Sequence, residues 1–449
     1  MTTHSTNSDK PRWSRRKLLA AMGTAAVGFA LGAERGAGAA QASAASAAGA
    51  GLGTGSTAPW FNVKDYGAKG NGFPHEDDAQ AIQTAIFAAG RGRFGGTVYI
   101  PAGKYTLGSS LVLMSNVRLL GEGAGVTTLK LGRIGIPVVH GNQVKHAAVE
   151  ALSFEGLGTL STDSSQLTER GVELKDSEHT HVRGCLFEMI AGGVWLKDCR
   201  HVSVTDSTFS TLFTSDNPYH GHGVYMEGGE QLEVRGNRFR KLEKACIYAA
   251  AGCSYSTIAG NEAELCNDTL VTVSSPLKRC AYLRIEGNTV RASGLGKGES
   301  SCKHGILVRY YCTDSVVAGN AVSRAAAAAI RLEGDAAAET ERLAGNVIDG
   351  NKLDDSPIGI ELVNSDANRV SGNDVRRIGV GIELTTSGEK GGSMTRDNVV
   401  TGNTLFRCTE AGIRVATARC ADNAVFGNGG AGNGEAIVDK GKGTVRSGF

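Results

Sequence analysis

Ring-bearing and ionisable side chains gather in the middle of this 449-residue sequence, between residues 195 and 311. Three successive short apolar segments carry a large ring at a position that should face outward, namely Trp195, Tyr225 and Tyr248. Rings that project outward one strand apart can form a platform for sugar rings. The neighbouring positions add histidines, cations and acids: His220, His222, Glu227, Lys244, Asp268, Lys303, His304, Arg309 and Tyr310. This density of groups predicts a binding groove with acid–base chemistry.

The balance of these groups favours β-elimination from a uronate-containing polysaccharide. That reaction needs a cation on the carboxylate, a base for the C5 proton and an acid for the leaving oxygen. Arg309 suits the carboxylate, because a guanidinium can pair with it through two hydrogen bonds. A lysine or histidine crowded by cations suits the base, and Tyr225 or His222 suits the acid. The predicted catalytic residues are His222, Lys244, Asp268, Lys303, His304 and Arg309, and the predicted substrate-binding residues are Trp195, Tyr225, Glu227, Tyr248, His220 and Tyr310.

Two other functions remain open. Hydrolysis needs two carboxylates roughly 5–10 Å apart. Glu227 and Asp268 should lie about two coils apart, on the order of 10 Å, which fits only an inverting hydrolase. A non-catalytic glycan-binding or surface protein would need the rings but not the ionisable groups. No metal ligands are predicted and no aspartate triplet marks a Ca²⁺ site, although one carboxylate together with substrate can still hold Ca²⁺.

The elements that must position these groups form an irregular repeat from about residue 170 onward. One mark is a glycine–asparagine pair that begins at Gly236, Gly260, Gly287, Gly319, Gly345, Gly372, Gly402 and Gly427. The other is a Gly-Val/Ile-x-Leu/Val segment such as Gly223–Met226. Such a repeat cannot bury its apolar face alone, but stacked repeats can, with the asparagines as a hydrogen-bonded ladder. We therefore expect an all-β, right-handed parallel β-helix over residues 97–440, with about 13–14 coils and an N-terminal capping helix.

Alternation within each Gly-Val-x-Leu segment predicts which side chains face outward. One outward column is Glu173, Trp195, Tyr225, Tyr248, Thr272, Leu307, Arg331, Glu361, Glu383 and Arg414. A second column beside it is Lys175, Lys197, Glu227, Ala250, Ser274, Arg309 and Glu333. Two long inserts, 211–221 and 291–303, enter this sheet from one corner, so we expect them to wall the groove. A slip of one residue would turn every floor residue inward.

Residues 60–96 should cap the solenoid. Asp77 can N-cap a helix whose apolar stripe plugs the open end and hides strand edges. That stripe is Ala81, Ile82, Ala85, Ile86 and Ala89. The segments Phe61–Gly72, Asp77–Ile86, Gly95–Tyr105 and Val117–Gly123 closely resemble the N-terminal region of the pectate-lyase superfamily, which includes polygalacturonases, lyases and phage tailspikes. The resemblance covers residues 60–125 and implies a β-helix fold and a carbohydrate substrate.

The polygalacturonase motifs themselves are incomplete. Gly221-His222-Gly223 is present, but the paired aspartates that precede it in those enzymes are missing. The segment most similar to their Arg-Ile-Lys motif is Arg284-Ile285-Glu286. The resemblance therefore does not supply a catalytic set.

Residues 1–44 have the pattern of a twin-arginine export signal. Arg15 and Arg16 precede an apolar run that ends at Ala33, and Ala-x-Ala cleavage sites begin at Ala40 and Ala42. We expect a secreted protein with no membrane span after cleavage, a flexible lead over 45–59 and a tail over 441–449.

Composition excludes several classes of partner. The formal charge is 47 − 45 = +2. Without the leader's six bases and two acids it is 41 − 43 = −2, so no bulk charge favours nucleic acid or an anionic membrane. We expect a monomer that binds a polysaccharide or oligosaccharide. Ten cysteines suit an oxidising compartment and allow one or two disulfides, whose connectivity the sequence does not reveal.

Overall fold

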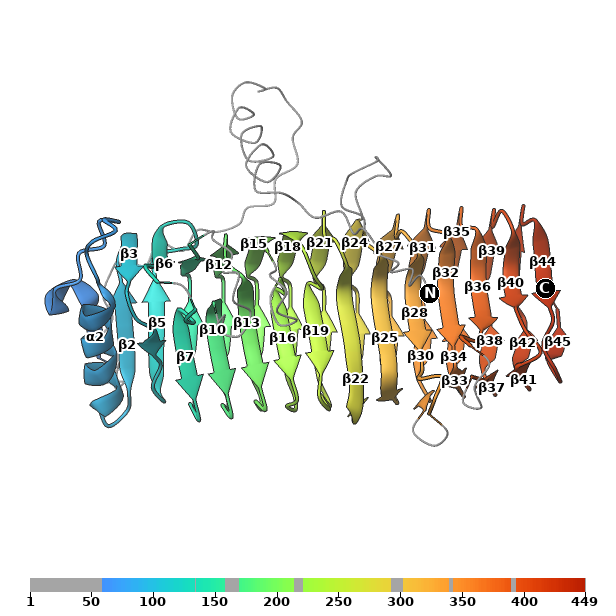
Figure 1. The fold of residues 1–449 in the computed structure, drawn as a ribbon, viewed down its shortest axis with the longest axis horizontal. Coiled ribbons are helices and arrows are strands. Elements are labelled where there is room, and N and C mark those ends of the chain that lie inside the picture. Colours follow the sequence, from blue (N-terminus) through green and yellow to red (C-terminus); the bar gives the residue numbers. More distant parts are fainter. Residues whose placement is uncertain are drawn as a thin grey trace, which may run out of the picture. The chain divides into compact units, whose positions relative to one another are not determined.

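A computed structural model describes residues 59–133, 135–157, 169–213, 221–291, 302–338, 342–388 and 393–448. Three parallel sheets run through these residues, and each turn of the chain adds one strand to each sheet (Figure 1). The export leader and the predicted site residue His220 lie outside the described residues. Within those residues, no helix has the length and apolar character that a membrane crossing requires.

Sheet A has 15 strands. In order they are β1 (Trp60–Asn62), β2 (Gly96–Ile100), β5 (Val117–Gly121), β8 (Ala148–Glu150), β11 (His181–Arg183), β14 (Ser203–Thr205), β17 (Glu233–Arg235), β20 (Thr257–Ala259), β23 (Arg284–Glu286), β26 (Val316–Ala318), β30 (Val347–Asp349), β34 (Arg369–Ser371), β38 (Val399–Thr401), β42 (Ala424–Phe426) and β45 (Val445–Ser447).

Sheet B has 13 strands. In order they are β3 (Gly103–Leu107), β6 (Thr127–Leu131), β9 (Ser153–Glu155), β12 (Leu186–Glu188), β15 (Thr208–Leu212), β18 (Arg238–Leu242), β21 (Glu262–Glu264), β24 (Thr289–Arg291), β27 (Ala321–Ser323), β31 (Lys352–Asp354), β35 (Asp374–Arg376), β39 (Thr404–Phe406) and β43 (Gly429–Ala431).

Sheet C carries the candidate site. Its main ladder is β4 (Leu111–Val112), β7 (Val139–Asn142), β10 (Arg170–Lys175), β13 (Gly192–Lys197), β16 (Val224–Glu227), β19 (Ile247–Ala250), β22 (Thr269–Ala281), β25 (His304–Thr313), β28 (Ala328–Glu333), β32 (Ile358–Val363), β36 (Val380–Thr385), β40 (Ala411–Val415) and β44 (Glu435–Asp439). The end of β25 starts a short branch of β29 (Leu343–Ala344), β33 (Ser365–Asp366), β37 (Thr395–Arg396) and β41 (Cys420–Ala421).

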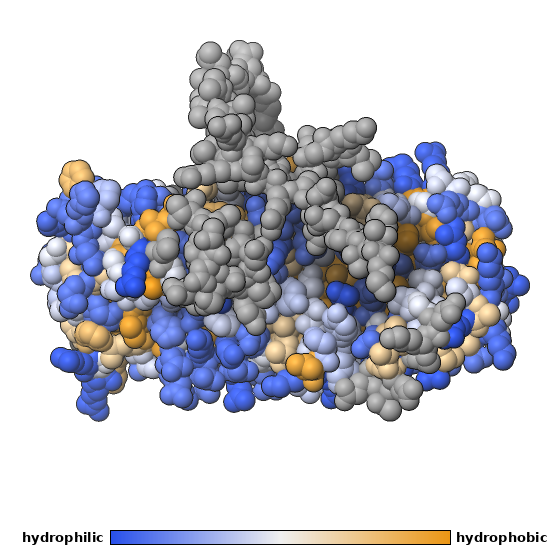
Figure 2. Space-filling view, viewed as in Figure 1, coloured by the Kyte–Doolittle hydropathy of each residue, from blue (hydrophilic) through white to orange (hydrophobic). Residues whose placement is uncertain are grey.

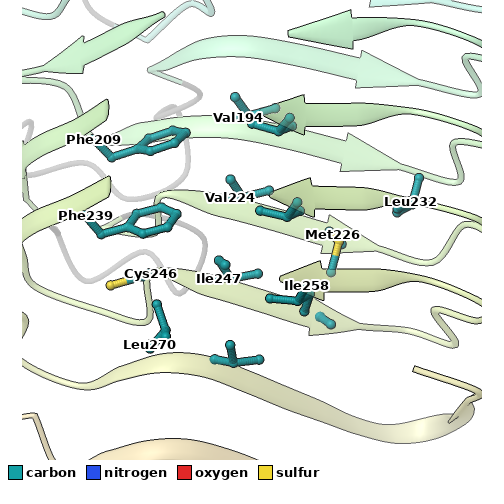
Figure 3. Packing of buried hydrophobic residues seen from close by; sticks show 14 of the residues in the cluster. Val194, Phe209, Val224, Met226, Leu232, Phe239, Cys246, Ile247, Ile258 and Leu270 are labelled. Carbon is teal, nitrogen blue, oxygen red and sulfur yellow. The ribbon is translucent and has the colours of Figure 1, made fainter. Parts of the chain in front are cut away.

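The interior explains the glycine that opens each Gly-Val-x-Leu segment. Phe187, Phe209 and Phe239 stack with ring centroids 4.7–4.9 Å apart, at the spacing of neighbouring strands. A Cβ added at Gly223 would lie 2.5 Å from the ring of Phe239, so only glycine fits opposite the phenylalanine. Figure 3 shows Phe209 and Phe239 one above the other, with Val194, Val224 and Ile247 among the facing side chains. The phenylalanine rings of these coils therefore stack at the same spacing as the strands that carry them.

The predicted asparagine ladder is present, with one correction. Each ladder amide accepts a backbone hydrogen bond from the previous coil and donates to the next side chain, as Asn288 does to Asn320 at 2.9 Å. The ladder is Asn237, Asn261, Asn288, Asn320, Asn351, Asn373, Asn403 and Asn428. The spacing predicts Asn346 as a member of this ladder. Asn346 instead belongs to a second ladder, which continues through Asn368, Asn398 and Asn423.

The N-terminal cap is built from β1, the short helix η1 (Val63–Tyr66) and helix α2 (Ala79–Arg91). The helix begins after Asp78, one residue later than predicted. The Asp78 side chain does not cap α2, because it accepts hydrogen bonds from the backbone of Lys69 and Gly70. Asp77 Oδ1 still accepts the N–H of Ala79 at 2.9 Å. Ile82 and Ile86 are fully buried, so α2 covers the first strands as expected.

Candidate functional site

The outer face of sheet C carries the predicted columns in the predicted register. Trp195 pairs with Tyr225, and Tyr225 pairs with Tyr248. The column begins at Glu173 and continues through Thr272, Leu307, Arg331, Glu361, Glu383 and Arg414. Val224 and Met226, on either side of Tyr225, are fully buried, so a slip of one residue would expose both and bury the tyrosine.

Trp195, Tyr225 and Tyr248 form what we call the ring floor. Tyr225 and Tyr248 stack with centroids 5.0 Å apart and planes 7° apart. Trp195 meets Tyr225 edge-on at 6.5 Å. The three rings are half-buried, so they offer apolar surface against which a sugar ring can pack. Figure 2 shows hydrophilic and hydrophobic residues intermixed on the visible surface of the solenoid.

His222 packs against this floor where the chain enters β16. Its ring centroid lies 5.4 Å from that of Tyr225 and 5.0 Å from that of Tyr248. Nδ1 lies 3.1 Å from the carbonyl oxygen of Ala245, so Nδ1 carries a hydrogen and donates it. In the neutral ring the lone pair then lies on Nε2. The neutral ring of His222 is therefore held in the tautomer in which Nε2 can accept a proton.

Arg170 is a cation of this site that the sequence patterns did not identify. It pairs with Gly192 along the ladder, and His222 lies on the following coil. A Cβ at Gly192 would lie 3.2 Å from Cγ of Arg170, so the glycine leaves room for the arginine side chain. The guanidinium lies over the ring of Trp195, 3.4 Å from its centroid, and donates to Glu173.

The carboxylate of Glu173 holds this cation in place. His140 and Lys175 lie 3.2 and 3.1 Å from its Oε1 atom. Burial opposes ionisation of Glu173, but hydrogen bonds from His140 and the charges of Arg170 and Lys175 outweigh it and lower its pKa to about 2. Glu173 is thus ionised at neutral pH and orients Arg170 toward the ring floor.

The floor carries a net positive charge. Lys197 and Glu227 form an ion pair at 2.9 Å beside Trp195 and Tyr225. Together with Arg170, Lys175 and Glu173 this makes three cations and two carboxylates, or 3 − 2 = +1. A net positive, partly buried floor favours an anionic ligand.

Four of the predicted catalytic residues lie at one edge of sheet C, but they are spread over several coils. They are His222, Lys244, Asp268 and Lys303. Lys244 hydrogen-bonds through its backbone to Gly221, so it lies beside His222. Asp268 follows on the next coil, and its carbonyl accepts the backbone N–H of Lys303 at 2.7 Å. Lys244 and Asp268 are half-buried, whereas Lys303 is exposed. Lys244 therefore joins the His222 cluster more closely than Lys303 does.

His304, Arg309 and Tyr310 form a separate group. His304 is buried on the ladder two coils beyond Ala245, and its Nδ1 lies 3.3 Å from the carbonyl oxygen of Ala328. Burial, with the charge of Arg331, lowers its pKa to about 4. Arg309 pairs with Glu333 at 3.2 Å and lies over the ring of Tyr310. The strand that carries Arg309 thus lies two coils beyond Tyr248.

Glu169 is a second residue that the sequence patterns missed. It immediately precedes Arg170, is 2% exposed, and accepts the N–H of Leu157 at 3.2 Å. Burial raises its pKa to about 7. A carboxyl group that holds its proton near neutral pH beside the site is a candidate acid.

Strand periodicity cannot reveal Arg170 and Glu169. Residues three apart face opposite sides of a straight strand, yet Arg170 and Glu173 touch. They meet because Arg170 lies at the very start of β10, where the chain turns into the sheet. A sequence signal for the contact between Arg170 and Glu173 does exist. It is an arginine and a glutamate three residues apart at the start of a strand, with a glycine at the position of the arginine on the next coil.

In the part of the chain that the structure describes, no group of three or more histidine, cysteine, aspartate or glutamate side chains converges to hold a metal ion.

Two family models match the chain. Residues 60–271 match the pectate lyase-like model of rhamnogalacturonase A and epimerases, and residues 276–446 match the right-handed β-helix region. The chain thus contains a pectate lyase-like domain followed by a right-handed β-helix region. The fold expected from the repeats and from residues 60–125 is thus confirmed.

Individual relatives match parts of this β-helix protein. Plasmin and fibronectin-binding protein A of Streptococcus pneumoniae is 31% identical over 187 residues, which are 40% of this chain and 24% of the relative. Alginate lyase 7 of Azotobacter vinelandii is 46% identical over 78 residues, 16% of this chain and 9% of the relative. The matched part thus spans less than a quarter of either relative's length.

The solved family 28 exopolygalacturonase of Yersinia enterocolitica superposes with a TM-score of 0.59 over 86% of this chain and 78% of that one. The two are 13% identical, so the likeness extends to the fold.

Proposed function

We propose that this protein is an exported polysaccharide lyase that cleaves a uronate-containing polysaccharide by β-elimination on the outer face of sheet C. The observation that carries the proposal is His222, held with its lone pair on Nε2 against Tyr225 and Tyr248, beside a net positive floor.

The proposed reaction assigns one step to each group. The substrate carboxylate binds at the partly exposed ammonium groups of Lys175 and Lys197, and the buried Arg170 adds its charge to theirs. These cations stabilise the charge that develops when C5 loses its proton. Nε2 of His222 takes that proton, the electron pair forms the C4=C5 double bond, and the C4–O bond breaks. The hydroxyl of Tyr225, beside His222, gives its proton to the leaving oxygen. Return of the proton from His222 to Tyr225 restores the starting state.

The relatives support the substrate class. Alginate lyase and exopolygalacturonase are named for polymers built of uronate sugars. The positive floor agrees with such a polymer, because each sugar unit brings a carboxylate.

The test is incubation of the purified mature chain with a panel of uronate polysaccharides, with and without Ca²⁺. A lyase produces ultraviolet absorbance from the new C4=C5 bond, in step with new reducing ends. New reducing ends without absorbance would contradict the lyase and indicate a hydrolase. Glu227 and Asp268 would then be the carboxylates to replace, although Glu227 is paired with Lys197.

A non-catalytic binding function is the second candidate, because the streptococcal relative is named as a binding protein. The two candidates differ in which residues matter. Binding of a uronate polymer without any turnover, unchanged in His222→Gln but lost in Trp195→Ala, would favour the binder.

Export is part of the proposal and rests on residues 14–44 alone. Replacing Arg15 and Arg16 with lysines should retain the chain in the cytoplasm of a host with a twin-arginine system. Undiminished export of that variant would contradict the predicted route.

A further inference from the structure

The ten cysteines are all buried, but their sulfur atoms have different neighbours. Sγ of Cys246 lies 3.2 Å from Sγ of Cys266. The other sulfurs with close polar contacts approach oxygen atoms. Examples are Cys253, 3.0 Å from the carbonyl oxygen of Gly228, and Cys302, 3.1 Å from that of Asp268. Among the described residues, Cys246 and Cys266 thus form the one sulfur–sulfur contact within hydrogen-bonding distance.

This contact lies directly beneath the candidate site. Cys246 is two residues after Lys244 and two before Tyr248, and it immediately precedes β19. Cys266 is two residues before Asp268 and belongs to the next coil. Figure 3 shows Cys246 among the interior side chains, near Phe239 and Leu270. The two sulfurs therefore meet inside the solenoid, between the two turns of chain that carry Lys244 and Asp268.

We propose that Cys246 and Cys266 form a disulfide that ties these two coils together under the site. The two thiols are oxidised by exchange with a small-molecule or protein disulfide. A thiolate of the pair attacks that disulfide, the resulting mixed disulfide is attacked by the second cysteine, and two reduced thiols leave. One sulfur–sulfur bond breaks, one forms, and two protons pass to the leaving thiols.

The burial of Cys246 indicates that thiol–disulfide exchange takes place before these two coils have folded against each other. Burial, and the approach of Cys266, raise the pKa of the Cys246 thiol well above its ordinary value, so the closed corner supplies little thiolate. The same burial protects the bond from reduction once it has formed. The cross-link closes a loop whose ends are 20 residues apart and so restricts the unfolded chain.

The stacked column of Cys253, Cys280 and Cys312 provides a matched control. Cys280 and Cys312 are direct ladder partners, and these three residues are as deeply buried as the proposed pair. Cys253 nevertheless donates to carbonyl oxygens, at 3.0 Å to Gly228 and 3.2 Å to Ala250. Deep burial alone therefore does not predict cross-linking.

The test refolds the full chain in a glutathione redox buffer, blocks free thiols in denaturant, and maps disulfide peptides by mass spectrometry. We expect one Cys246–Cys266 peptide and 10 − 2 = 8 free thiols. Cys246→Ser should show all nine remaining thiols free, whereas Cys253→Ser should keep the bridge and show 9 − 2 = 7. Ten free thiols in the unmodified chain, or a bridge mapped to Cys266–Cys302, would overturn the proposal without any variant having to fold.

A stability measurement supplies a second readout. Reduction should lower the urea midpoint of the unmodified chain and of Cys253→Ser, but should leave Cys246→Ser unchanged. An equal response of all three chains would also overturn the proposal. Neither readout depends on turnover, so the disulfide proposal and the lyase proposal are tested independently.

Discussion

His222 and His304 occupy the same column of sheet C, three coils apart, and yet their surroundings differ. Both place Nδ1 near the carbonyl oxygen of the next coil, that of Ala245 or Ala328. Both histidines are buried, but His222 packs against Tyr225 and Tyr248, whereas His304 lies beside Arg331 and its burial lowers its pKa to about 4. A base with so low a pKa is weak, so we assign catalysis to His222 and a packing role to His304.

Replacement of the two histidines should therefore separate their roles. His222→Gln should lower the rate of β-elimination by about 10²–10⁴-fold, the usual contribution of a general base. His304→Gln should leave the rate within a few fold. Initial rates with saturating uronate polymer, together with circular dichroism to confirm folding, decide the matter. Similar losses in both variants would remove the distinction.

Glu169 should make folding stability depend on pH. Burial raises its native pKa to about 7, above the 4.5 expected when unfolded, so between these values the native state binds more protons. Its favourable contribution is complete below the unfolded pKa and is lost as the pH rises through 7. Glu169→Gln should accordingly be more stable than the unmodified chain at pH 8, by up to about 3 kcal/mol, with the difference shrinking toward pH 5. Urea midpoints at the two pH values measure this, and a gap that is the same at both would contradict it.

Among the strands, the repeat unit could be predicted from the sequence, but the pairing of asparagines between successive coils was harder to predict. The Gly-Asn marks and the Gly-Val-x-Leu segments correctly predicted inward apolar columns and outward polar ones. They placed Asn346 in the first ladder, because Gly345-Asn346 and Gly350-Asn351 are only five residues apart and carry the same mark. Which pair joins Asn320 is determined by the coil path, and the structure shows that it is Asn351.

The ladder should contribute measurably to stability. Asn288 is 1% exposed and its amide joins the coils of Asn261 and Asn320. Asn288→Ala removes these partners and leaves buried backbone groups unpaired, which should cost about 2–3 kcal/mol in the free energy of unfolding. Asn142→Ala, at an exposed asparagine of β7, is the control and should change it by less than about 0.5 kcal/mol. Equal losses in urea unfolding would argue against the ladder.

Much of the candidate site was predictable, but its central cation was not. Trp195, Tyr225 and Tyr248 follow from period-two alternation, and the structure has them in one column. Arg170 reaches the ring floor from a bend at the start of β10, which no strand periodicity describes. Arg309, the cation that the second outward column suggested, is on the outer face but pairs with Glu333. Long-range pairing of charges decides such cases, and it depends on the full three-dimensional coil path.

At the scale of the whole molecule, the solenoid depends on its cap. Helix α2 packs against β1 and β2 and buries Ile86, while the adjacent Phe87 is 41% exposed. An open end of a parallel solenoid would present unpaired strand edges and apolar side chains to other molecules. The cap therefore protects a stack whose coils otherwise contact only their neighbours.

Two adjacent substitutions test this role. Ile86→Asp buries an unpaired charge and should leave little soluble monomer in size-exclusion chromatography. Phe87→Asp, one residue along the same helix, should elute as the unmodified chain does. Soluble, monomeric Ile86→Asp protein with an unchanged melting temperature would show that the cap is dispensable.

The most direct test of β-elimination at His222 compares three proteins on one uronate polymer: the unmodified chain, His222→Gln and His304→Gln. We expect ultraviolet absorbance from new C4=C5 bonds with the unmodified chain and His304→Gln, and almost none with His222→Gln. Absorbance that is equal in His222→Gln, or reducing ends that appear with no absorbance in any of the three, would contradict β-elimination at this site.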